Sequence, residues 1–312
     1  MKRKFIWLIL LAICLTVLAV YLYPTPVTPP GDLYAQVDPL LLASLRSFRQ
    51  QHPPQTINVY GLEWEYVSLG QGKEAILFLH GLTGAYEIWW QQIGALQEAY
   101  RIVSVTYPAV DSLEELGQGV MAILQQEGLS RVNLVGSSLG GYLAQYLVAR
   151  YPGAVSRAVF ANTLPPNDRI AEKYGTLGAI LPYAPELLVM AVLRYSFRNT
   201  IYPAANYDEL VLAYLLEISY GGVSKAQVAG RYQCVIEPFE PPDVDALGIP
   251  ALILEASNDP LVEEALREQM RATYPTARVI DMGEVSHFPY LSQPERYTSW
   301  LQEFFSAPVT GD

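Results

Sequence analysis

The sequence has few of the residues that build disulfide frameworks and metal sites. Only two cysteines occur in 312 residues, Cys14 and Cys234, and they lie far apart in the chain. They offer neither a disulfide framework nor a cysteine-based metal site. The three histidines, His52, His80 and His287, are too few for a histidine-rich metal centre. We therefore expect no metal ion and no organic cofactor.

Positive charge is also scarce. The chain has 20 basic and 31 acidic residues, for a net charge of −11. This balance argues against a nucleic-acid partner, which would require a basic face. Apolar residues, in contrast, are abundant at 51%. They suffice for a sizeable core, and the length allows one large domain with an insertion or two domains.

The N-terminus combines a cluster of bases with a long uncharged stretch. Lys2-Arg3-Lys4 precede residues 5–23, which contain no charged side chain. As a helix this stretch is roughly 28 Å long, close to the hydrocarbon thickness of a bilayer. Because the bases precede it, we expect a cytoplasmic N-terminus and an extracytoplasmic main domain. A cleaved signal peptide with secretion is the alternative, and a buried core helix is less favoured.

A Gly-Ser motif stands at the centre of the sequence. Gly136-Ser137-Ser138-Leu139-Gly140 fits the pattern G-x-S-x-G. The β-branched run at 132–135 predicts a strand before the motif, and the spacing after it predicts a helix. Strand, tight turn and helix form the context of a nucleophile elbow, with Ser138 at the apex. Gly136 and Gly140 lack a Cβ, so the strand and the helix can approach closely. A plain Gly/Ser turn is the alternative.

Strand and helix patterns alternate on both sides of this motif. Apolar runs at 57–69, 75–79, 102–105, 158–161, 251–254 and 278–282 predict strands, and helical spacing separates most of them. This alternation predicts an α/β fold with a mostly parallel sheet and helices on both faces. Ligands bind at the carboxyl ends of the strands in such sheets. His80 and Ser138 both follow predicted strands, so we expect them at one site.

The alternation is interrupted between residues 165 and 248. Helical patterns at 181–195, 207–218 and 224–232 follow one another without a convincing strand, which predicts a helical cap inserted into the core. We therefore expect four segments, listed in order: a membrane anchor and proline-rich spacer (1–31), the first part of the core (32–164), the cap (165–248) and the second part of the core (249–312).

A serine nucleophile needs a base beside it. In chains with this type of elbow, the acid and then the histidine follow the serine. His287 is the only histidine after Ser138, and it lies just past the last predicted strand. Asp259 follows the strand after the cap, where it would hold the His287 tautomer. Asp259 precedes a proline and could instead be a helix N-cap. Glu255 and Asp168 are the alternative acids.

Catalysis by such a serine also needs backbone N–H groups that stabilise the developing oxyanion. The N–H of Leu139 directly follows the nucleophile at a helix N-terminus. The N–H of Leu82, which follows His80-Gly81, is the natural second donor. We interpret His80 as a residue that shapes this loop rather than as a second base.

Together these motifs resemble the α/β-hydrolase superfamily over about residues 56–305. The motifs that carry the resemblance are His80-Gly81, the elbow at 136–140, Asp259-Pro260-Leu261-Val262 and His287-Phe288-Pro289. The resemblance implies a sheet of about eight strands with a helical cap over the active site.

Within the superfamily the chain is most similar to the maspardin-like members. The segments with this similarity include Tyr107-Pro108, 136–145, Val235-Ile236-Glu237-Pro238 and Phe288-Pro289-Tyr290-Leu291. The resemblance implies a binding or adaptor protein without a complete triad. This chain departs from that pattern because it has His287 and His80-Gly81, and its N-terminal anchor is not a maspardin-like feature.

Two functions follow from these observations. The first is a membrane-anchored serine hydrolase that cleaves an ester-type bond, in a carboxylester, a lipid or another acyl compound, with a small and apolar substrate. The alternative is a non-catalytic adaptor on the same fold. A haloalkane dehalogenase is disfavoured, since its nucleophile would be an aspartate where Ser138 stands. Esterase, lipase, amidase and peptidase chemistry remain open.

Overall fold

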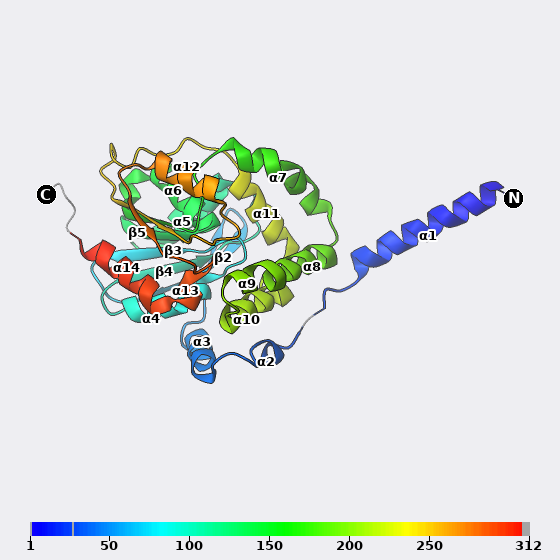
Figure 1. The fold of residues 1–312 in the computed structure, drawn as a ribbon, viewed down its shortest axis with the longest axis horizontal. Coiled ribbons are helices and arrows are strands. Elements are labelled where there is room, and N and C mark those ends of the chain that lie inside the picture. Colours follow the sequence, from blue (N-terminus) through cyan, green and yellow to red (C-terminus); the bar gives the residue numbers. More distant parts are fainter. Residues whose placement is uncertain (1, 27, 308–312) are drawn as a thin grey trace.

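Figure 1 shows the computed structural model of the protein, which describes residues 2–26 and 28–307. Residue 27 of the expected spacer and residues 308–312 of the expected last core segment lie outside this part. The side chains of residues 2, 3, 30, 168 and 174 lie outside it as well. A sheet with helices on both faces forms the body, and helix α1 extends away from it.

The sheet of the described residues has eight strands, in the order β1-β2-β4-β3-β5-β6-β7-β8. Its strands are β1 (Gln55–Val59), β2 (Leu62–Leu69), β3 (Ala75–Leu79), β4 (Arg101–Thr106), β5 (Val132–Ser137), β6 (Val155–Ala161), β7 (Ala251–Glu255) and β8 (Arg278–Asp281). β1 and β2 pair antiparallel, β2 also runs antiparallel to β4, and all other neighbours are parallel. The predicted α/β-hydrolase fold with a mostly parallel sheet is thereby confirmed.

Helices cover both faces of the sheet (Figure 1). The core helices are α3 (Pro39–Gln51), η1 (Tyr86–Trp89), α4 (Trp90–Leu96), α5 (Leu113–Gln126), α6 (Leu139–Arg150), η2 (Pro152–Ala154), α12 (Glu264–Thr273), α13 (Pro289–Ser292) and α14 (Pro294–Ser306). Side chains alternate across a strand, so Ile76 and Phe78 of β3 enter one core cluster and Leu77 and Leu79 the other. This two-sided burial explains why the central strands are continuous apolar runs.

A group of helices lies between β6 and β7 in the sequence. They are α7 (Asp168–Ile180), η3 (Leu181–Tyr183), α8 (Glu186–Ser196), η4 (Phe197–Ile201), α9 (Tyr202–Ala204), α10 (Glu209–Glu217), η5 (Ile218–Gly222) and α11 (Lys225–Ile236). Figure 1 shows them on the side of the sheet from which α1 extends. The sequence predicted helices near α8, α10 and α11 but none at α7. The glycines Gly175 and Gly178 weaken its local helical signal.

Helix α1 (Lys2–Leu22) is the one described helix that is long and apolar enough to cross a membrane. None of its apolar stretch is buried inside the structure, so the idea of a core helix was wrong. The extended stretch after α1 is shorter than predicted, because the short helix α2 (Pro30–Leu33) already begins at Pro30.

We call the helices between β6 and β7 the cap. One arginine fastens helix α3 to both the cap and the core. Arg49 donates two hydrogen bonds to Glu217 of α10, at 2.9 and 3.0 Å, and one to Glu87 of η1 at 2.5 Å. The hydroxyl of Tyr34, just after α2, also donates to Glu217 at 2.6 Å. The segment that follows the spacer is therefore an integral part of the body.

Candidate active site

Ser138 occupies the turn between β5 and α6, in a backbone conformation with φ of 56°. A non-glycine residue at positive φ is strained, and such strain clusters at functional sites. The turn is held by a bond of 3.0 Å from the Ser138 N–H to the Ala161 carbonyl. A Cβ on Gly136 would lie 2.1 Å from the Gly140 carbonyl oxygen, and one on Gly140 would lie 2.0 Å from the Leu79 oxygen. Only glycine fits at either position.

His287 and Asp259 form a buried pair beside this turn. The distances from His287 Nδ1 to the two carboxylate oxygens of Asp259 are 2.8 and 3.0 Å. Asp259 lies in the loop after β7 and His287 in the loop after β8, at the carboxyl edge of the sheet. With the Nδ1 proton shared with the carboxylate, Nε2 is free to accept a proton.

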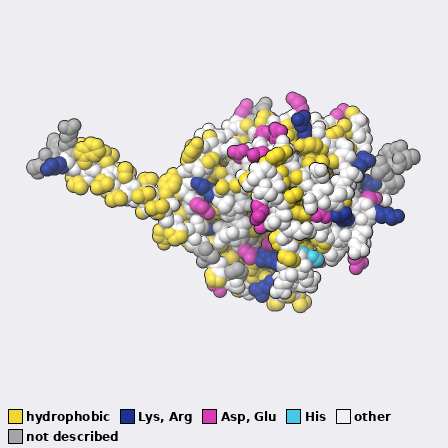
Figure 2. All heavy atoms as spheres, turned by 180° about the vertical axis from the view of Figure 1, so that it is seen from behind, with side chains coloured by type: hydrophobic (Ala, Val, Ile, Leu, Met, Phe, Trp, Pro, Cys, Tyr) yellow, Lys and Arg dark blue, Asp and Glu magenta, His cyan; other side chains and the backbone are white. Residues whose placement is uncertain are grey.

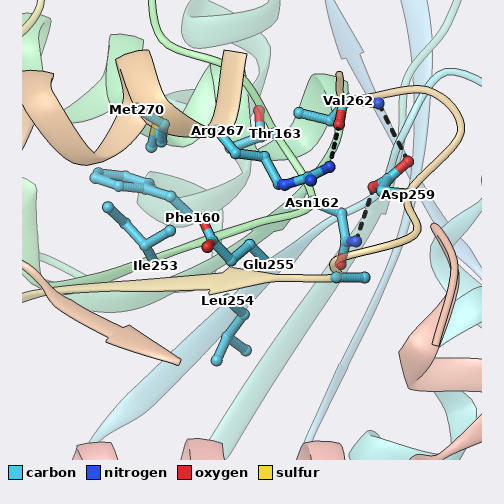
Figure 3. A pocket seen from close by; sticks show the side chains of 11 residues that line it. Phe160, Asn162, Thr163, Ile253, Leu254, Glu255, Asp259, Val262, Arg267 and Met270 are labelled. Carbon is cyan, nitrogen blue, oxygen red and sulfur yellow. Dashed lines mark hydrogen bonds between the residues drawn. The ribbon is translucent and has the colours of Figure 1, made fainter. Parts of the chain in front are cut away.

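Asp259 is held as a carboxylate by several donors. The N–H groups of Leu261 and Val262 donate to Oδ1 at 2.8 and 3.2 Å, and the Asn162 amide donates to Oδ2 at 2.9 Å. Burial by itself raises the pKa of Asp259, but the charge and hydrogen bond of His287 and the other donors lower it below its ordinary value. Figure 3 shows Asn162 and Val262 on two sides of the carboxylate.

Sequence reasoning missed Asn162. Its side-chain amide bridges the loops of the pair, since it bonds Asp259 and also the Ser286 carbonyl at 3.2 Å. Its backbone has φ of 42°, a conformation that asparagine tolerates better than most residues. One signal was present in the sequence: Asn162 directly follows a predicted strand at the edge where the site was expected.

Arg267, drawn in Figure 3, fixes the loop after β7. Arg267 of α12 donates to the carbonyls of Val262 at 2.7 Å and Ser257 at 3.1 Å, one on each side of Asp259. The alternative acid Glu255 is bound by Arg271 and is not the partner of His287. The side chain of the other alternative, Asp168, lies outside the described part.

One hydrogen bond connects the serine turn to the segment that holds the Asp259 carboxylate. Thr163, next to Asn162, donates from its hydroxyl to the Ser138 carbonyl at 2.7 Å. Among the described residues, no hydrogen bond joins the Ser138 hydroxyl to His287. Catalytic hydrogen bonds often tighten only when substrate is bound. The structure therefore brings the His–Asp half together, and the Ser–His hydrogen bond is not formed within the described part of the chain.

One expected oxyanion donor, Leu139, directly follows the serine, and the other, Leu82, belongs to the loop after β3. Leu139 is the first residue of α6, so its N–H has no acceptor within the helix and points from a positive helix end. The loop after β3 passes close to the nucleophile: a Cβ on Gly81 would lie 3.1 Å from Ser138 Cβ and 3.6 Å from its Oγ. Leu82 follows directly in that loop.

His80 supports this loop from within the core. It is fully buried, its Nδ1 lies 2.6 Å from the Gly81 carbonyl, and its Nε2 accepts from the Tyr107 N–H at 3.4 Å. Nδ1 therefore carries the proton of a neutral ring. Burial, together with the positive charge of Arg231, holds the pKa of His80 well below its usual value. The geometry agrees with a loop-shaping residue.

Arg231 of cap helix α11 is a second residue that sequence reasoning missed. Its guanidinium is completely buried and donates to the carbonyls of Leu82 at 2.9 Å, Gly84 at 3.1 Å and Tyr107 at 2.5 Å. Burial lowers its pKa to about 10. No carboxylate within the described part of the chain pairs with it. Nothing in the local sequence of α11 marks this arginine, because its partners are distant in the chain.

Comparison with known proteins agrees with this architecture. The sequence matches the model of the alpha/beta hydrolase family over residues 76–300. It is 25% identical to maspardin of Danio rerio over 231 residues, which are 73% of this chain and 72% of that protein. It is 22% identical to 3-oxoadipate enol-lactonase 2 of Acinetobacter baylyi, over 79% of this chain and 94% of the enzyme.

Among solved structures, a membrane phospholipase A described as a bacterial virulence factor superposes with a TM-score of 0.64 at 20% identity. That match covers 100% of both chains. At this identity, the likeness demonstrates a shared fold. Since the family model spans most of the sequence and the sheet has the expected eight, mostly parallel strands, the chain belongs to the alpha/beta hydrolase family.

Proposed function

We propose that this protein is a membrane-anchored serine hydrolase that cleaves an ester-type bond through an acyl-enzyme intermediate. The observation that carries the proposal is the buried His287–Asp259 pair, with Nδ1 on the carboxylate at 2.8 Å, beside a strained serine turn. Hydrolytic chemistry also agrees with the family to which the chain belongs. The catalytic residues are then Ser138, His287 and Asp259.

The reaction proceeds in two halves. Ser138 Oγ attacks the acyl carbon while His287 Nε2 takes the hydroxyl proton, and the Leu82 and Leu139 N–H groups stabilise the oxyanion. The carbon–oxygen bond to the leaving group then breaks, and His287 returns the proton to the departing alcohol. Water attacks the acyl-serine and gives its proton to His287. The bond between the acyl carbon and Ser138 Oγ then breaks, His287 returns the proton to Oγ, and the acid is released. Asp259 stabilises the imidazolium throughout.

The proposed substrate is a small carboxylester, a lipid or another acyl compound with apolar character, and no cofactor takes part. The names enol-lactonase and phospholipase A belong to enzymes that open ester bonds, which agrees with an ester for this chain as well. Helix α1 provides the proposed anchor, with its basic end in the cytoplasm and the catalytic domain outside. Secretion after signal cleavage is the alternative.

A non-catalytic adaptor is the second candidate. The 25% identity to maspardin is comparable to the 22% identity to the enol-lactonase, and Ser138 does not hydrogen-bond His287 among the described residues. In that case the protein would bind a partner without turnover.

Labelling with a fluorophosphonate probe tests the proposal. The full chain in detergent micelles should react with the probe, and Ser138→Ala and His287→Ala should both abolish labelling. Ser137→Ala is the matched control, since its fully buried hydroxyl is not the proposed nucleophile, and it should label normally. A folded wild-type protein that remains unlabelled would contradict the proposal and favour the adaptor.

A further inference from the structure

The outer side of the cap exposes a group of large apolar side chains, which we name the cap face. Its members, with their exposed fractions, are Leu177 (52%), Ile180 (57%), Tyr183 (76%), Leu188 (51%), Val192 (68%) and Tyr195 (69%). Soluble proteins rarely expose apolar side chains in such a concentration without an interaction partner.

The exposed apolar residues of α8 lie on one side of the helix. Leu188, Val192 and Tyr195 are four and three residues apart, so they form one stripe along α8. The opposite side of α8 buries Val189 and Met190. Between Lys173 and Arg194 the sequence contains only one charged residue, Glu186. The helix is therefore apolar on both its inner and its outer side.

The cap face is continuous with helix α1. The Tyr21 hydroxyl, in the last turn of α1, donates to the Tyr183 carbonyl in η3, and α1 contacts α8. Figure 1 shows α1 leaving the body beside α8. In Figure 2, apolar side chains run along α1 and onto the adjoining part of the body. Two apolar surfaces from distant parts of the sequence thus meet at this point.

This junction fixes the height of the cap face relative to a bilayer. If α1 spans the membrane, Tyr21 lies near the end of the spanning stretch, and Tyr183 must lie at the same level. Tyrosine is enriched at membrane–water interfaces, and Tyr183 and Tyr195 are both exposed. The turn at Tyr183 is held rigidly, because Lys225 of α11 donates to the carbonyls of Pro182 at 2.8 Å and Ala184 at 3.1 Å.

We propose that the cap face rests in the headgroup–acyl boundary of the bilayer that holds α1. The proposal depends on the membrane anchoring in the proposed function, and it adds a substrate class, namely acyl lipids taken directly from that bilayer. A lipid surface fits better than a protein partner, because the face continues the surface of the spanning helix and its six side chains carry no charge. The cap is then a membrane-facing entrance to the site.

Depth measurements on the full chain test the placement. A nitroxide label is attached at Val192→Cys in a Cys14→Ser background, and the protein is reconstituted in phosphatidylcholine vesicles. The label should be reached more readily by oxygen than by a water-soluble nickel chelate. The matched control is Tyr60→Cys, 84% exposed in the turn between β1 and β2, whose label should show the opposite preference.

Equal exposure of both labels to water would overturn the proposal. Spin–spin coupling between Val192 labels of two molecules would show a second copy on the cap face and overturn it too.

Activity measurements separate this proposal from the proposed function. Val192→Asp combined with Tyr195→Asp should lower hydrolysis of vesicle phosphatidylcholine at least tenfold, with hydrolysis of a soluble short-chain ester unchanged within about twofold. Tyr60→Asp should change neither activity. An equal loss on both substrates, or no loss on vesicles, would contradict the cap-face proposal. Absence of any ester hydrolysis by the wild type would instead refute the proposed function, and the label depths would still decide the placement.

Discussion

Two buried histidines lie at the carboxyl edge of the same sheet, but their surroundings differ. His287 faces the Asp259 carboxylate, whereas His80 is surrounded by backbone groups and the guanidinium of Arg231. One loop is built around a negative charge that can stabilise an imidazolium. The other loop is built around a positive charge that opposes it. The nearest charge, not the residue type or its position on the sheet, decides which histidine can act as a base.

The same contrast extends to the supports of each loop. Asn162 and Arg267 hold the loop of Asp259 by bonds from within the core. Arg231 of helix α11 holds the loop of Leu82, which contains the second of the proposed oxyanion donors. The acid–base half of the site therefore belongs to the core, whereas the oxyanion half depends on the cap. Substitutions in the two halves should differ in their effects.

Breaking the His287–Asp259 pair should have the largest effect. His287→Gln removes the base, and Asp259→Asn favours the wrong tautomer of His287. We expect each to lower kcat for a short-chain ester by about a thousandfold or more. Steady-state kinetics with a chromogenic ester measure the loss, and circular dichroism checks that the variants fold. Residual activity above about a tenth of wild type in either variant would rule out these roles.

Arg231→Met should weaken the oxyanion half. Three carbonyls lose this donor. The carbonyl of Tyr107 keeps Gln227 as a second donor at 3.0 Å, and each of the other two costs about 1–3 kcal/mol when unpaired. The free energy of unfolding should fall by about 3 kcal/mol or more. With the loop of Leu82 loosened, kcat should fall by about a hundredfold, the order expected for loss of one oxyanion donor.

A matched control exists for Arg231. Arg157 is also buried and also donates to backbone carbonyls, those of Phe305 and Ala307, far from the serine in the fold. Arg157→Met should therefore lower the free energy of unfolding with little change in kcat. If the two variants lose activity to the same extent at a temperature where both are folded, Arg231 has only a general structural role.

Asn162→Gly should have a smaller effect on the acid–base half. Glycine keeps the positive-φ backbone and removes only the amide, so Asp259 loses one of its donors and its pKa rises. We expect kcat to fall about tenfold with the Michaelis constant unchanged. Asn206→Gly is the control, because Asn206 has a similar φ of 54° but is exposed in the cap. A kcat for Asn162→Gly equal to that of this control would speak against the role of the amide.

The smallest effect concerns the pH dependence of stability. The pKa of His80 is lowered in the fold, so below about pH 6.5 the unfolded chain binds a proton that the folded protein does not. Above that pH His80 is neutral in both states and does not reduce the free energy of unfolding. Below it, the free energy of unfolding falls by about 1.4 kcal/mol per pH unit until the pH reaches the folded pKa. His80→Gln should remove this component from urea unfolding curves between pH 7 and 5. Parallel pH profiles for variant and wild type would show that His80 takes up its proton in the fold.

Much of the sheet could be predicted from the sequence because its central strands are buried on both faces. The run at 75–79 matches β3 residue for residue. Ser138 and His287 could be singled out as well, one from the elbow motif and the other as the only downstream histidine. The elbow motif is a local sequence signal, and His287 is identified because it is the only histidine after Ser138.

The remaining parts depend on contacts that no local pattern records. Arg231 acquires its role from carbonyls at positions 82, 84 and 107, more than 120 residues away in the chain. Helix α7 contains two glycines, but Gly178 allows close packing on Tyr232 and Ile236 of α11. Packing overrides weak local propensity there. The sequence therefore predicts the reacting groups better than the groups that hold them.

The bridge made by Arg49 has a consequence for how the molecule could open. Its guanidinium holds Glu217 of the cap and Glu87 of the core at the same time. A rigid hinge motion of the whole cap would separate these carboxylates and leave one of them without its cation. We therefore expect substrate to enter through a local rearrangement of a few cap helices, with the rest of the cap staying in place. Helix α3, the first long helix after α1, holds the cap and the core together through this arginine.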